Sequence, residues 1–440
     1  MNYELTDSYD HQILRLALPS ICANITIPLL GLADLAIMGH VGDAVLIGAI
    51  AAGSMIFNVV YWLFGFLRMG TSGLTAQAYG KKDVGGLVDL LGQSLFIALT
   101  IAAIIIILQV PILKGAYVCL SPSTELASHI HTYFNILIWG APAVLALSSL
   151  TGWLIGMQDT RTPMTISILQ NLLNILISAV LVLIFHYGIR GAALGTLIAQ
   201  WLGLALCLLF LRLRHYNHTT LTTGISSFRQ WKSGWFARHF VIHRDIFLRT
   251  LFLIAVNFFF LSAGSRQGET VLAANALLMT FFTLYSYFMD GFAYAGEALC
   301  GKYYGANDIK ALDEVSRHLF KWGLIMIIVF TIAYTTTGRT CLHLLTTDDN
   351  VVEVAIGFLP WVWLVPLAGM AAFVYDGIFV GLTASRQMLI SSAVAMTLFF
   401  IVFFSLQATF HNHALWLAFI LFLFARGIVQ HFYKPQLWKL

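Results

Sequence analysis

Charge is scarce in this sequence: Asp, Glu, Lys and Arg make up 10% of the 440 residues, whereas hydrophobic residues make up 59%. Soluble domains carry about 25% charged residues, so a soluble fold of this size would lack the polar surface that it needs. Cysteine is also sparse, with five scattered residues and none at a metal-binding spacing. The net charge of +4 is small, and no basic patch with interleaved aromatics indicates nucleic-acid binding. These shortages indicate an integral membrane protein with the lipid bilayer as its solvent.

Catalytic motifs are missing as well. The sequence holds no HExxH, no GxSxG and no Walker loop, and no soluble domain that could hydrolyse ATP. We therefore expect no enzymatic activity, no metal and no cofactor.

The long apolar runs predict membrane-spanning helices. A helix needs about 20 apolar residues to cross the hydrocarbon core, and these runs are far longer than the roughly 10-residue strands of a membrane barrel. Because backbone groups cannot stay unpaired in lipid, each run must be helical. The fold class is therefore all-α, with twelve predicted spans: 12–39, 46–78, 86–110, 129–156, 164–187, 190–213, 246–265, 271–303, 315–337, 354–382, 388–409 and 413–432.

Lysine and arginine are distributed unevenly between the two sets of loops. Cytoplasmic loops carry an excess of these residues. One set is nearly empty, with Lys114, Arg190, Arg266 and Arg339. The rich set holds Lys81, Lys82, Arg161, Arg212, Arg214, Arg229, Lys232, Arg238, Arg244, Arg249, Lys302, Lys310, Arg386, Lys434 and Lys439. We therefore expect a cell-membrane protein, in the inner or plasma membrane, with both termini in the cytoplasm.

The two halves of the sequence are related. Residues 42–46 recur as 268–272, an offset of 226, and residues 152–156 recur as 377–381, an offset of 225. Because the offset covers six spans, both halves start on the same side of the membrane, so this is a parallel repeat with a pseudo-two-fold axis along the membrane normal. The predicted organisation is a six-helix lobe at 1–213, a cytoplasmic linker at 214–245 and a second six-helix lobe at 246–440.

Charges inside predicted spans are costly and are therefore candidate functional groups. Asp290 and Glu297 are seven residues apart on one helix face. Arg68, the one clear membrane-embedded cation, takes the repeat position of Tyr294 between them, so we hypothesise that it faces this acidic pair across a cleft. In the alternative, each charge pairs within its own lobe. Asp376, in the tenth span, completes this cleft or gating network.

Asp34 lies deep in the first predicted span. Burial in an apolar bundle disfavours the charged form of a carboxyl group, so Asp34 is a candidate to bind a proton on one side of the membrane and release it on the other. In the alternative, Asp34 only forms hydrogen bonds to neighbouring helices. Asn171, Asn174 and Ser178 in the fifth span supply further polar groups, and Thr196 in the sixth span could join them.

Aromatic residues make up 14% of the chain, and the twelve methionines add flexible apolar side chains. Some could line an adaptable cavity for substrate. The candidates for substrate contact are Met38, Met69, Met289 and Tyr294.

Several stretches together resemble the multidrug and toxic compound extrusion (MATE) family, and within it the branch of the DNA-damage-inducible protein F (DinF). They cover essentially the whole chain: 32–42, 73–80, Asn174 followed by 191–196, 290–298, 376–381 and 412–418. The resemblance implies two six-helix bundles arranged in a V, and antiport of organic cations or other amphipathic small molecules against protons or sodium. We expect a monomer.

The family's coupling residues map onto Asp34, Asn174 and Thr196. Many relatives carry a second carboxylate one turn after the asparagine, where this chain has Ser178. One carboxylate with neutral oxygens should bind sodium less tightly, which favours H+ over Na+ as the coupling ion.

Other functions stay open at this point. A flippase for lipid-linked precursors would keep the fold, but it usually needs several cationic residues for pyrophosphate, and Arg68 is the only clear one. A channel or receptor is less consistent with the parallel repeat and the buried acids, which favour a carrier.

Overall fold

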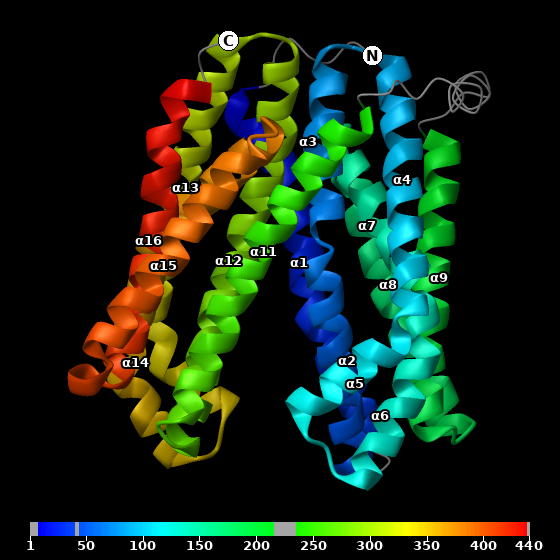
Figure 1. Ribbon diagram of the computed structural model, residues 1–440, viewed down its shortest axis with the longest axis vertical. Coiled ribbons are helices and arrows are strands. Elements are labelled where there is room, and N and C mark those ends of the chain that lie inside the picture. The colour runs from blue at the N-terminus through cyan, green and yellow to red at the C-terminus, as the bar shows by residue number, and fades with distance from the viewer. Residues whose placement is uncertain (1–7, 40–43, 215–234, 438–440) are drawn as a thin grey trace. The chain divides into compact units, whose positions relative to one another are not determined.

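A computed structural model describes residues 8–39, 44–214 and 235–437, and it leaves out the side chains of 27, 29–30, 32–36, 38–39, 44, 214, 235–239 and 437. Throughout these ranges the chain is helical apart from short turns (Figure 1). The first half holds α1 (Tyr9–Gly39), α2 (Ala44–Leu63), α3 (Phe66–Gly80), α4 (Val84–Ile107), α5 (Gln109–Leu120), α6 (Thr124–Leu137), η1 (Ile138–Gly140), α7 (Ala141–Gly156), α8 (Arg161–Ala179), η2 (Val180–Ile184) and α9 (Gly188–Arg214). The second half holds α11 (Trp235–Ser265), α12 (Glu269–Gly305), α13 (Ile309–Leu345), α14 (Asp349–Gly381), α15 (Ser385–Phe410) and α16 (Asn412–Leu437).

The helices confirm the predicted all-α membrane fold. Within the described ranges, eleven helical stretches are long and apolar enough to cross a membrane. They match the second to twelfth predicted spans, and the first predicted span, 12–39, lies on α1.

Two helical segments lie where the sequence predicted a loop or linker. Helix α5 is too short to span a bilayer. Helix α11 begins at Trp235, so the last eleven residues of the predicted linker, 235–245, are helical. The rest of that linker, apart from Arg214, lies outside the described residues.

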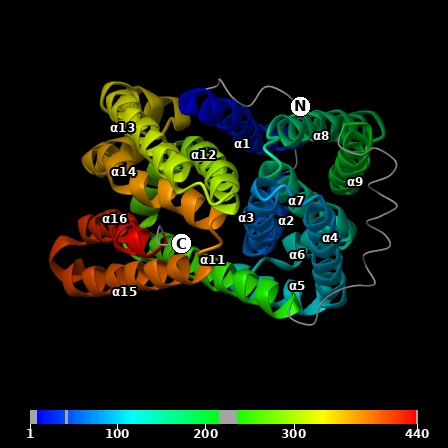
Figure 2. The ribbon, with the colours of Figure 1, turned by 90° about the horizontal axis from the view of Figure 1, so that it is seen from above.

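The chain divides into two compact units. Unit 1 comprises Met1–Ile21 with Phe236–Leu440, and unit 2 comprises Cys22–Trp235. In unit 1, α12 packs along α14, and α15 and α16 lie side by side (Figure 2). In unit 2, α3 packs on α7, and α8 on α9. Helix α1 contributes to both units. The lobe boundaries at 213 and 246 stay a prediction.

Glycine contacts repeat between the two units. A Cβ on Gly152 would lie 2.3 Å from the carbonyl oxygen of Arg68, and a Cβ on Gly377 would lie 2.3 Å from that of Ala293. Because real Cβ atoms essentially never come this close to another atom, the backbones of α3 and α12 can approach α7 and α14 this closely at these two positions only because each is a glycine. The pairs correspond at an offset of 225, so the structural counterpart of Arg68 is Ala293. The predicted correspondence with Tyr294 was therefore wrong by one residue.

Candidate functional site

Three of the predicted coupling residues meet in unit 2. Asn174 Nδ2 donates to Thr196 Oγ1 at 3.3 Å, and Ser178 Oγ donates to Asn174 Oδ1 at 3.1 Å. Thr196 Oγ1 in turn donates to the carbonyl of Ala192 at 3.1 Å. Asn174 and Ser178 are buried. We call Asn171, Asn174, Ser178 and Thr196, together with Thr26 on α1, the amide–hydroxyl cluster.

The cluster extends to helix α1. Asn171 lies about one turn before Asn174 on α8, and its Nδ2 donates to Thr26 Oγ1 at 2.9 Å. The Thr26 hydroxyl donates to the carbonyl of Ala23 at 2.7 Å, so its oxygen is free to accept. The polar face of α8 therefore reaches α1 on one side and α9 on the other.

Local backbone features bring α8 and α9 together at Ser178. A Cβ on Gly195 would lie 2.3 Å from Ser178 Oγ and 2.8 Å from Ser178 Cα, so only glycine allows this approach. Two residues after Ser178, the helix continues as the π-helical turn η2. Such turns are rare and occur often at functional sites.

Asp34, the sharpest sequence candidate, lies on α1 eight residues after Thr26. Its side chain and that of Met38 lie outside the described residues, so their assigned roles stay predictions.

A second polar cluster lies in unit 1. Asp376 Oδ2 accepts hydrogen bonds from Arg249 Nη2 and Arg426 Nη2, and its Oδ1 accepts from Gln430 Nε2 at 2.7 Å. All four side chains are buried, and they come from α11, α14 and α16. Asp290, on α12, adds an electrostatic attraction to Arg426. We call Arg249, Asp376, Arg426 and Gln430 the arginine–aspartate cluster.

This cluster corrects two sequence-based interpretations. Arg249 was assigned to a cytoplasmic loop, and Arg68 was taken as the only clear embedded cation. Arg249 lies within the span Phe240–Ser265 and Arg426 within Asn412–Gln436. Sequence reasoning missed both because an arginine near a span end is usually solvated, and their partner is 127 and 50 residues away.

The other predicted residues are dispersed. Arg68, on α3, is half-buried in unit 2, whereas Asp290 and Glu297, on α12, belong to unit 1. The pairing of Arg68 with this acidic pair stays a prediction. Among the substrate-contact candidates, Met289 is fully buried, and Met69 and Tyr294 are half-buried; their roles are also untested.

The first turn of α1 is held in unit 1 by charge. Asp10 accepts from Lys321 Nζ at 2.8 Å and from Trp322 Nε1 at 2.8 Å, and it contacts His318 Nδ1 at 2.9 Å. The hydrogen bonds from Lys321 and His318 lower the pKa of Asp10 to about 2. This ionised anchor attaches the start of α1 to α13.

Known proteins are similar to this chain in sequence and in fold. The MatE family model matches residues 19–180 and 246–405. The DNA damage-inducible protein F of Escherichia coli (strain K12) is 37% identical over 425 residues, which cover 96% of this chain and 91% of that protein. The multidrug export protein MepA of Staphylococcus aureus (strain MW2) is 20% identical over 90% of this chain and 87% of its own.

The fold is also that of a solved structure described as the outward-facing conformation of a multidrug resistance MATE family transporter of the MOP superfamily. The two superpose with a TM-score of 0.84 at 18% identity, over 98% of this chain and 96% of that one.

Proposed function

Because the chain belongs to the MatE family of membrane transporters, we propose that it exports amphipathic or cationic organic compounds as a monomer, by alternating access driven by proton antiport. The names of its relatives support drug-like cargo, since one is a multidrug export protein. The observation that carries the coupling proposal is the amide–hydroxyl cluster, in which Asn174 binds both Ser178 and Thr196.

Helix geometry relates this cluster to Asp34. The spans that contain α1 and α8 are the first and fifth crossings, so they run in the same direction. Thr26 and Asn171 are in contact, and from there Asp34 is eight residues along α1, about 12 Å, while Ser178 is seven residues along α8, about 10 Å. We therefore expect the backbone of Asp34 at about the height of Ser178. A carboxyl there would exchange its proton beside neutral amide and hydroxyl groups.

The arginine–aspartate cluster is a poor site for a sodium ion. Sodium is a hard cation that needs several oxygen ligands. The carboxylate of Asp376 already binds the guanidinium groups of Arg249 and Arg426. A sodium ion at Asp376 would meet two like charges at roughly 4 Å, each costing about 4 kcal/mol at a moderate effective dielectric constant. The neutral oxygens of the amide–hydroxyl cluster are a poor substitute for a second carboxylate.

The test is efflux of a fluorescent organic cation from proteoliposomes under an imposed pH gradient or an imposed sodium gradient. We expect efflux driven by the pH gradient, lost in Asp34→Asn and retained in Glu353→Gln, a matched neutralisation of an exposed carboxylate. Efflux driven only by sodium would overturn proton coupling but keep the exporter. Absence of efflux under both gradients, with the protein folded, would overturn the exporter.

A flippase for lipid-linked precursors is the alternative. The two buried arginines supply cations that the sequence did not predict to be embedded, but both bind Asp376 and so are already neutralised in part. A pyrophosphate would have to displace this carboxylate. Transbilayer movement of a pyrophosphate-linked lipid, measured in the same vesicles, distinguishes the two functions.

A further inference from the structure

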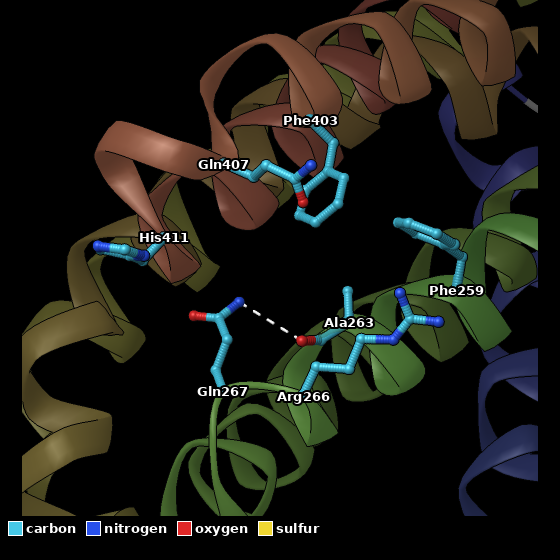
Figure 3. A pocket seen from close by; sticks show the side chains of 7 residues that line it. All are labelled: Phe259, Ala263, Arg266, Gln267, Phe403, Gln407 and His411. Carbon is cyan, nitrogen blue, oxygen red and sulfur yellow. Dashed lines mark hydrogen bonds between the residues drawn. The ribbon is translucent and has the colours of Figure 1, made fainter.

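Unit 1 contains a small cavity between the end of α11 and the end of α15. Its volume is about 150 Å³. The lining side chains are Phe259, Ala263, Arg266, Gln267, Phe403, Gln407 and His411. Figure 3 shows them around the hollow, with Phe259 and Phe403 on one side, Gln267 and His411 on the other, and the Arg266 guanidinium extended toward Phe259.

The polar side of the cavity offers donors and a net positive charge. Arg266 is exposed, and it forms no ion pair or hydrogen bond with the part of the chain that the structure describes. The amides of Gln267 and Gln407 and the ring of His411 line the same cavity from the other side of the hollow, while the Arg266 guanidinium extends toward Phe259. The lining includes no carboxylate. A planar guanidinium with an incomplete set of partners suits a phosphate or carboxylate, to which it donates two parallel hydrogen bonds.

The apolar side of the cavity continues into a phenylalanine surface. The Phe259 ring packs edge-on against Phe400 and Phe403, with centroids 4.9 Å and 5.1 Å away. Phe404 and Ile401, on α15, are more than half exposed. Both residues lie within the span Ser385–Phe410, so an apolar surface continues from the cavity along α15. The cavity thus joins a site for an anionic group to a surface for a hydrocarbon tail.

The cavity lies at the level of a membrane surface. The spans Phe240–Ser265 and Ser385–Phe410 both end there, and both of their following turns lie at the end of unit 1 away from the C-terminus. At the α15–α16 turn, His411 has φ 47°, and the next residue, Asn412, exchanges two amide hydrogen bonds with Asn275 at 2.8 and 2.9 Å. His411 is therefore held at the cavity rim.

We propose that this cavity binds the phosphate group of an anionic membrane lipid, with Arg266 as its counter-ion and the lipid tail along the phenylalanine surface of α11 and α15. The volume suits one phosphate group and excludes a drug-sized molecule, whose pockets measure about 300–1,000 Å³. The site is distinct from both clusters described above, and it does not depend on the coupling ion.

The test is native mass spectrometry of the full chain in a neutral detergent. The probes are lysophosphatidylglycerol, a monoacylglycerol of the same chain length, and inorganic phosphate. We expect one lysophosphatidylglycerol to bind saturably, with affinity lowered about tenfold or more in Arg266→Gln, because a charge-assisted hydrogen bond is lost. Arg339→Gln is the matched control, since Arg339 is an exposed arginine near the same end of unit 1. Gln407→Ala, with a neutral exposed side chain, should weaken binding less.

Three outcomes would overturn the proposal. Equal weakening by Arg266→Gln and Arg339→Gln would mean non-specific attraction to positive charge. Binding of the monoacylglycerol as tight as that of lysophosphatidylglycerol would leave only an apolar groove. Displacement by inorganic phosphate at similar concentrations would indicate a free-anion site without a role for the lipid tail. The melting temperature of each variant shows that the fold is intact.

Discussion

Neutralising Asp376 should destabilise the protein strongly. Asp376 is the shared acceptor of two buried guanidinium groups and of Gln430. Asp376→Asn keeps the shape of the side chain. The amide of Gln430 can turn so that its Oε1, which has no partner in the structure, accepts a hydrogen bond from the asparagine at position 376. The loss is therefore mainly that of the charge, which leaves two buried cations undercompensated. Removal of one partner from a buried ion pair costs about 3–5 kcal/mol.

The loss is measurable as a melting temperature in detergent. For a unit of about 200 residues, 1 kcal/mol corresponds to roughly 2–4 °C, so Asp376→Asn should melt about 10 °C below the wild type. The control Glu353→Gln should melt within about 2 °C of it, since neutralising an exposed charge has little effect on stability. Adding Arg249→Met to Asp376→Asn should recover part of the loss, because one undercompensated cation is removed.

The opposite results would refute this reasoning. If Asp376→Asn has the same melting temperature as the wild type, the carboxylate carries no fixed charge in the cluster. If Asp376→Asn is stable but its efflux no longer responds to the pH gradient, Asp376 exchanges protons and the coupling site has been assigned to the wrong unit. If Arg249→Met worsens the loss, the packing of the arginine matters more than its charge.

Two further predictions test other contacts. Gly195→Ala should destabilise the fold by about 1–3 kcal/mol, because the Cβ of the new alanine would overlap Ser178. We expect a lower melting temperature and lower efflux. Gly357→Ala, an exposed helical control with open space around it, should be neutral or slightly stabilising; equal losses in both variants would refute the close approach. Asp10→Asn should lower the melting temperature at pH 7. The pKa of Asp10 is depressed from 3.8 to about 2, so the stabilisation by its carboxylate is complete above pH 4 and is lost as pH falls toward 2. The melting temperatures of variant and wild type should therefore converge over that range. A constant difference between them would count against the ion anchor.

The sequence predicted helix identity well because the signals are local. Apolar runs of span length, bounded by turn residues, need no tertiary information. The structure confirms the second to twelfth predicted spans, with shifts of up to eight residues at their ends. Helix α5 was missed because its 12 residues follow α4 with only a one-residue break, at Leu108. The repeat was visible from its glycines, but its register near Arg68 was not, since the slip of one residue is resolved only where α3 meets α7.

The candidate site residues also differ in whether a local sequence signal predicts them. Asn174, Ser178 and Thr196 could be grouped because the family resemblance names the asparagine and threonine, and because Asn174 and Ser178 lie on one face of α8. The partners of Asp376 had no such signal, since an acid and two arginines on three different helices share no periodicity.

By itself, the sequence determined the solvent, the helical class, the repeat and the residue types available for proton transfer. Composition and apolar run length control these properties, and both are written along the chain. The tertiary structure alone decided which charges meet. It brought Arg249 and Arg426 onto Asp376 and assigned the start of α1 to unit 1. It also gathered Arg266, Gln407 and His411 around one cavity. The physical reason is that a buried charge is stabilised by the groups that surround it in space, and packing between distant helices selects those groups.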